Sequence, residues 1–190
     1  MFENSLADPG PISFTEVRFL GARETPDRTS NKAYGLGVEL SSMIDQGFYG
    51  DIGYWVLEES KGEENDVGRF SLGLGYAEGL GEATAAFVRA GFEWERGRKH
   101  SANFLSLIHE DDTLFGGDEN EVGFSGELGL RHRASSHLEI VAGVRGETLR
   151  KDSVGWFAML RGFITPNFAL LVGFEDTDEE TLTLGLAVVF

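Results

Sequence analysis

Apolar side chains recur at every second position along ten stretches of the chain. The last stretch shows this most clearly, since Leu182, Leu184, Leu186, Val188 and Phe190 alternate with smaller residues up to the final position. Successive side chains of a β-strand point to opposite faces, so a period of two predicts a strand. We expect strands at about 13–21, 34–41, 48–56, 70–76, 86–95, 122–131, 138–147, 154–164, 168–175 and 181–190.

The connections between these stretches alternate between tight turns and longer, mostly charged segments. Turns are expected at about 45–47, 78–82, 134–136 and 166–167, and the longest connection runs from about 96 to 120. The final strand ends at the last residue of the sequence, and we expect no later segment to cover its apolar face.

These features resemble the small outer-membrane β-barrels of bacteria, the OmpA/OmpX-like class, whose closing strand commonly ends in Phe and whose periplasmic turns are shorter than their extracellular loops. The pattern and the resemblance predict an all-β fold, a ten-stranded antiparallel transmembrane β-barrel. We expect an up-and-down meander with short periplasmic turns and longer extracellular loops. It would form a single domain over residues 1–190 in the outer membrane of a Gram-negative bacterium.

The first strand has the least regular alternation. Val17 and Phe19 share one face, whereas Ile12 and Phe14 have the opposite parity, which predicts a bulge or a late strand start. We expect a polar loop over 22–31. The seam between the first and last strands, near 12–19, is where the pattern supports the barrel least.

Aromatic residues on the apolar face are predicted to lie near the two ends of the strands, with aliphatic residues between them. Two aromatic girdles around an aliphatic band are typical of the two interfaces of a membrane. The alternative fold, a soluble lipocalin-like barrel, has no physical reason to sort its aromatic residues by depth. The predicted interface aromatics are Tyr34, Phe48, Tyr54, Phe70, Tyr76, Trp94, Phe124, Trp156, Phe168, Phe174 and Phe190.

Composition narrows the function classes. The 190 residues carry 32 acidic and 16 basic side chains, a net charge of -16, which argues against a nucleic-acid partner. There is no cysteine, so disulfides and thiolate metal sites are excluded, and we expect no metal or cofactor. No apolar run approaches the roughly 20 residues of a membrane helix. The first residues lack the features of a signal peptide, and we expect that an export signal has been removed.

Charged residues occupy the strand face opposite the apolar band. Charges facing lipid would cost several kcal/mol in mid-bilayer, so these residues are predicted to point into the lumen. They could form a charged pore or a plug of Arg–carboxylate pairs, and the mixture of both signs favours the plug. Inward glycines leave room for long Arg side chains or for water. The predicted lumen charges are Glu39, Asp51, Arg69, Arg89, Glu93, Glu127, Arg131, Glu139, Arg145, Glu147, Arg161 and Glu175.

The connection at 96–120 contains the only concentration of reactive side chains. Its candidates for a hydrolase at the barrel rim are His100, Ser101, His109, Glu110, Asp111 and Asp112. Omptin proteases are also ten-stranded barrels, but these residues share one loop and do not reproduce the omptin catalytic pattern. A solvated loop is the alternative interpretation.

Basic residues at the start of the same connection suggest a lipid contact. Arg96, Arg98 and Lys99 follow Trp94 and could pair with lipopolysaccharide phosphates at the outer interface.

We expect a monomeric, non-enzymatic surface barrel that acts in membrane integrity or surface interaction through its acidic loops. Its expected partners are outer-membrane lipid, lipopolysaccharide and, through the C-terminal strand, the barrel-assembly machinery. A narrow porin-like passive channel for small solutes and a rim hydrolase remain the alternatives.

Overall fold

The computed structural model describes residues 12–26, 33–59, 66–98, 119–149, 152–177 and 179–190, which form ten antiparallel strands. No helix in this part of the chain is long and apolar enough to cross a membrane. The strands are β1 (Glu16–Pro26), β2 (Ala33–Asp45), β3 (Phe48–Glu59), β4 (Asp66–Gly79), β5 (Thr84–Arg98), β6 (Glu119–Ser135), β7 (Leu138–Glu147), β8 (Ser153–Thr165), β9 (Phe168–Asp176) and β10 (Glu179–Val189).

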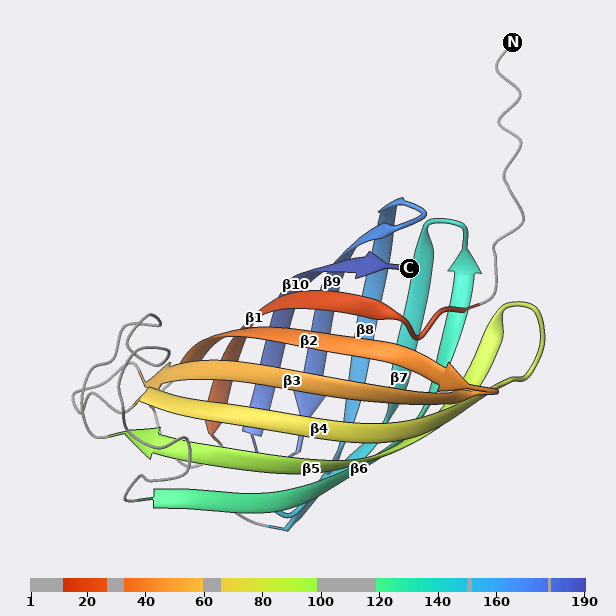
Figure 1. Ribbon diagram of the computed structural model, residues 1–190. Helices are drawn as coiled ribbons and strands as arrows, with labels where there is room; N and C mark the ends of the chain where they lie inside the picture. Colours follow the sequence, from red (N-terminus) through yellow and green to blue (C-terminus); the bar gives the residue numbers. More distant parts are fainter. Residues whose placement is uncertain (1–11, 27–32, 60–65, 99–118, 150–151, 178) are drawn as a thin grey trace.

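The ten strands close into a single barrel in which each strand pairs with its neighbours in sequence and β1 pairs with β10. The predicted ten-stranded antiparallel meander is therefore confirmed. Figure 1 shows the turns that follow β2, β4, β6 and β8 at the same end of the barrel as the C-terminus. We call this the short-turn end, and the other end the long-loop end.

The seam between β1 and β10 is continuous. Residues from Glu16 to Pro26 pair with residues from Val189 to Glu179 without a shift of register. The late start of the first strand is thus observed, at Glu16, and no bulge accompanies it. The strand also runs beyond Gly21, because its polar residues still alternate between the two faces; the expected loop over 22–31 was wrong for its first residues.

Register shifts occur instead next to three of the short turns. They lie between Met43 and Asp45, between Arg133 and Ser135, and between Phe163 and Thr165. A bulge adds one residue to one strand and increases the local twist. It allows the tight turn to close while the two strands keep their alternation.

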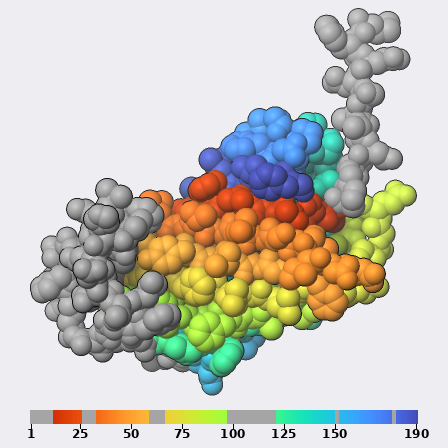
Figure 2. Space-filling view, viewed as in Figure 1, coloured from red at the N-terminus to blue at the C-terminus, as the bar shows by residue number. Residues whose placement is uncertain are grey.

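The apolar surface of the molecule faces outward. Aliphatic side chains such as Leu36, Leu74 and Leu184 are 75%, 56% and 56% exposed, whereas Glu93, Arg161 and Glu139 are almost completely buried. Figure 2 shows the outer wall as a continuous surface over neighbouring strands. Exposed apolar residues, which occur on every strand, are unfavourable in water and favourable in a hydrocarbon layer. The outer face is therefore suited to a lipid bilayer.

Candidate functional site in the barrel lumen

Polar and charged side chains on the inner face of the sheet form the candidate functional site. The pleat of each strand turns every second residue inward, which brings these side chains from all parts of the chain into one lumen. Glu139 is fully buried there. The other predicted lumen charges line a single cavity: Glu39, Asp51, Arg69, Arg89, Glu93, Glu127, Arg131, Arg145, Glu147, Arg161 and Glu175.

One compact group of charges, the short-turn cluster, consists of Glu16, Arg131, Arg133, Glu139 and Arg161. The Glu139 carboxylate accepts hydrogen bonds from Arg131 Nε at 2.5 Å and from Arg161 Nη1 at 2.8 Å. Arg133 Nη2 lies 3.3 Å from the second Glu139 oxygen, and Arg161 also donates to Glu16. Because these groups are shielded from water, they are stabilised mainly by one another.

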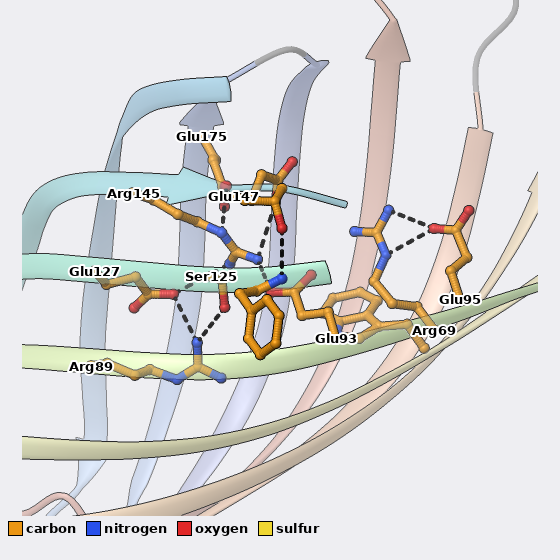
Figure 3. Close-up of polar contacts among 12 residues, drawn as sticks. Arg69, Arg89, Glu93, Glu95, Ser125, Glu127, Arg145, Glu147 and Glu175 are labelled. Carbon is orange, nitrogen blue, oxygen red and sulfur yellow. Dashed lines mark hydrogen bonds and ion pairs between the residues drawn. The ribbon is translucent and has the colours of Figure 1, made fainter. Parts of the chain in front are cut away.

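Arg145 is at the centre of a second group near the middle of the lumen and the long-loop end (Figure 3). Its Nη2 lies 2.5 Å from Glu93 Oε1 and 3.4 Å from Glu147 Oε2. Its Nη1 and Nε lie 3.3 Å from Glu127 and 3.3 Å from Glu175. One guanidinium group thus joins carboxylates from four strands, β5, β6, β7 and β9.

Arg89 extends this group to the opposite wall. Its Nε and Nη2 form a paired contact with Asp51 of β3 at 2.8 Å and 2.6 Å. Its Nη1 donates to Ser125 at 3.2 Å and to Glu127 at 3.4 Å. Such two-pronged Arg–carboxylate pairs have fixed geometry. Together, Asp51, Arg89, Glu93, Ser125, Glu127, Arg145, Glu147 and Glu175 make up the central cluster.

Glycines on two neighbouring strands provide the space for Arg89. A Cβ atom on Gly73 would lie 2.6 Å from Arg89 Nε, and one on Gly91 would lie 2.8 Å from Arg89 Nη1. Real Cβ atoms do not approach other atoms so closely. Here the inward glycines accommodate a long Arg side chain, one of the two roles that the sequence leaves open for them.

Sequence reasoning missed several lumen charges. Glu16, Arg18 and Glu24 of β1 share the inward parity, and Arg18 pairs with Glu16 and with Glu39 at 3.2 Å each. The alternation along β1 could have revealed these three charges, because they occupy the face opposite to that of Val17 and Phe19. Glu95 was also missed, and it accepts from Arg69 at 3.2 Å near the long-loop end.

The cavity that remains in the lumen has a volume of about 270 Å³. It reaches from Phe14 and Glu16 near the short-turn end to Thr177 and Thr181 near the long-loop end. Within the described ranges, no group of three or more His, Cys, Asp or Glu side chains could hold a metal ion. The arrangement of these residues is that of charge pairing within a narrow polar space.

The predicted interface aromatics lie in two zones of the outer face. Phe48, Tyr76, Phe168 and Phe190 lie at the short-turn end, where the rings of Phe48 and Tyr76 are 5.1 Å apart. The remaining aromatics lie in the half of each strand nearer the long-loop end: Tyr34, Tyr54, Phe70, Trp94, Phe124, Trp156 and Phe174.

All six residues suggested for a rim hydrolase fall outside the described part of the chain. This holds for His100, Ser101, His109, Glu110, Asp111 and Asp112, and also for Lys99. Arg98 is the last residue of β5, but its side chain is not among those that the structure describes. Arg96, two residues after Trp94, is half-buried.

Comparison with solved structures finds the same fold in bacterial membrane proteins. The NanC porin superimposes with a TM-score of 0.55 at 10% identity, over 92% of this chain and 100% of that one. The β domain of the Bordetella autotransporter BrkA gives a TM-score of 0.52 at 14% identity, over 93% and 98%. No family model and no curated protein matches the sequence.

Because the sequence identities are low, the similarity to these structures concerns the fold alone. It covers nearly all of both chains, and it coincides with the two other features found above, the exposed apolar belt and the charged interior. An apolar outer belt, a charged lumen and a closed meander of strands are together typical of a membrane-spanning barrel. By its fold and its surface, the protein is a small β-barrel of the kind found in bacterial outer membranes.

Proposed function

We propose that the protein is a closed, non-enzymatic barrel of the Gram-negative outer membrane, which contributes to membrane integrity or surface interaction through its extracellular loops. The observation that carries this proposal is the pairing of charges across the lumen. Arg145 and Arg89 bridge strands on several sides of the barrel, and Glu139 binds three guanidinium groups. An interior held together in this way favours a rigid support over an open pore.

The same proposal includes the surroundings of the barrel. As a monomer it would contact outer-membrane lipid through its apolar belt, and lipopolysaccharide phosphates through Arg96, Arg98 and Lys99. The barrel-assembly machinery would recognise the C-terminal strand that ends in Phe190.

The proposed role in membrane integrity can be tested in cells. A mutant strain lacking the protein should become more permeable to detergents and large antibiotics, and the complete chain should restore the barrier.

The purified protein in planar bilayers tests the closed state. We expect no stable unitary conductance at neutral pH, because the charge network and the residues around it leave no wide aqueous path. Stable current steps from the unaltered protein would overturn the closed-barrel proposal.

A narrow passive channel is the second candidate. It is favoured by the cavity of about 270 Å³ and by the similarity in fold to the NanC porin. The bilayer measurement separates the two, since only this candidate requires current from the unaltered protein.

A further inference from the structure

The segment that precedes β1 places an aromatic ring inside the barrel. Phe14 is buried, and its ring stacks on Tyr49 of β3 with ring centres 4.9 Å apart and an interplanar angle of 27°. It also meets Phe87 of β5 at 6.2 Å, and Phe87 meets Phe157 of β8 at 6.3 Å. The Arg131 guanidinium lies 4.9 Å from the centre of the Phe14 ring, a favourable cation–π contact.

These four rings cross the lumen from one wall to the opposite wall. In the closed order of the barrel, β3 and β8 lie on opposite sides of the ring of strands. The path from Tyr49 through Phe14 and Phe87 to Phe157 therefore spans the interior. We call these four residues the aromatic layer. Its rings offer no charged group to an ion, in contrast to the central cluster.

Phe14 separates two cavities. The lumen cavity contacts Phe14, Tyr49, Phe87 and Phe157 from the side of the charge clusters. A second cavity of about 550 Å³ lies at the short-turn end, where it is lined by Ile12, Phe14, Ala77, Ala85 and neighbouring residues. Among the described residues, Phe14 is the only one that lines both cavities.

Hydrogen bonds outside the strand ladder hold this segment in place. The Ser41 hydroxyl donates to the Phe14 carbonyl at 2.8 Å, and the Met43 amide donates to the Thr15 hydroxyl at 3.0 Å. On the other side, the Phe190 amide donates to the Thr15 carbonyl at 3.0 Å. These bonds fix the backbone on both sides of the Phe14 side chain, toward β2 and toward the end of β10.

We propose that Phe14 is a stopper that closes a cation pathway through the barrel at its short-turn end. This inference rests on the closed barrel proposed above: the charge network narrows the lumen, and Phe14 closes the narrow path that the network leaves. An apolar constriction excludes ions because it cannot replace their hydration shell. The lumen cavity is lined by eight carboxylates and six guanidinium groups, so the path behind the stopper favours small hydrated cations over anions.

Removal of the ring tests the stopper directly. Phe14→Ala joins the two cavities, and we expect discrete current steps in planar bilayers where the unaltered protein gives none. A gradient of KCl should shift the reversal potential toward the potassium value. Phe19→Ala is the matched control, because it removes the same ring from the lipid-facing side of β1, where Phe19 is 51% exposed. This control should be as silent as the unaltered protein.

A cysteine variant and a thiol reagent test the same proposal if Phe14→Ala weakens the fold. The chain has no cysteine, so Phe14→Cys introduces a single thiol. The Phe14→Cys protein should conduct, and benzyl methanethiosulfonate should restore closure by placing a new aromatic ring at this position. The same reagent on Phe19→Cys should change nothing. Heat-modifiable migration on gels would identify folded samples of every variant.

The outcomes distinguish the stopper from the closed barrel. If the unaltered protein and folded Phe14 variants are all silent, the stopper is wrong and the closed barrel stands. If the unaltered protein conducts and Phe14→Ala adds nothing, both are wrong. If it conducts and Phe14→Ala raises the conductance, the closed barrel is wrong and Phe14 still narrows the path. An opened pore that prefers anions would refute the cation pathway.

Discussion

At the scale of single residues, the interior of this barrel depends on a few charges that have no access to water. Glu139 is the clearest case, because one carboxylate with no exposed surface neutralises guanidinium groups of β6 and β8. Loss of one member of such a group leaves its partners charged and poorly solvated. The free-energy cost therefore comes mainly from the charged partners that remain, and less from the side chain that is replaced.

Glu139→Gln should therefore be strongly destabilising. We expect a loss of about 3 kcal/mol or more in the free energy of unfolding, the range for a buried charge pair with one partner removed. Urea titration of the protein in detergent micelles measures it. Glu147→Gln is the matched control, since the Glu147 side chain is 18% exposed and lies 3.4 Å from Arg145; its loss should stay below about 1 kcal/mol. Equal losses at both positions would contradict this account of the short-turn cluster.

At the scale of the strands, alternation determines which residues meet lipid and which meet the lumen. Along β6, Leu128 and Leu130 point outward while Glu127 and Arg131 point inward. The cost of a charge on the outer face depends on depth, since only the centre of a bilayer lacks water and head groups. The middle and the ends of a strand should thus respond differently to the same substitution.

Leu128→Lys, near the middle of β6, should cost about 2–4 kcal/mol of stability in lipid, the range for a lysine at the bilayer midplane. Leu138→Lys, at the first residue of β7 beside a short turn, should cost about 0–1 kcal/mol, because the ammonium group reaches the interface there. Unfolding in lipid vesicles measures both. An equal cost at the two positions would show that Leu128 does not face the bilayer centre.

The strands also show how much of the structure could be predicted from the sequence. The period of two gave the ten strands and the inward parity of residues such as Arg145 and Glu175. It did not give their partners, because pairing across the lumen depends on the stagger between strands, which alternation leaves undetermined. The end of β1 was missed because Arg23, Glu24 and Thr25 are polar, although polar residues can face the lumen as well as solvent.

Phe14 escaped prediction for a related reason. On an outward-facing pattern its parity looked irregular, and only the closed barrel brings it beside Tyr49 and Phe87. Its parity is that of the inward residues Glu16 and Arg18, but the parity of one aromatic residue does not show which rings it meets. The presence of such a layer follows from the three-dimensional path of the chain.

At the scale of the whole molecule, closure depends on the pairing of the first and last strands. Phe19 and Leu186 are direct partners across this seam, whereas Leu170 pairs with Leu186 on the next strand along. Direct cross-strand partners have Cα separations suited to a disulfide, and residues two strands apart do not.

A cysteine pair at this seam should thus report closure and register together. The double variant Phe19→Cys with Leu186→Cys should form a disulfide on mild oxidation in detergent, which is visible as a shifted band on non-reducing gels. Phe19→Cys with Leu170→Cys is the control and should stay reduced. Crosslinking of the control pair alone would mean that β1 and β10 are not neighbours in solution.

The hydrogen bonds at this seam also impose an order on folding. The Ser13 hydroxyl donates to the Phe190 carbonyl at 3.0 Å, and the Phe190 amide donates to Thr15. The segment that carries Phe14 is thus anchored on the last residue of the chain, and these bonds form only after β10 has met β1. A barrel whose ends have not yet joined lacks these bonds and keeps only the contacts of this segment with β2. Pairing of β1 with β10 is therefore also the step that completes the anchoring of Phe14.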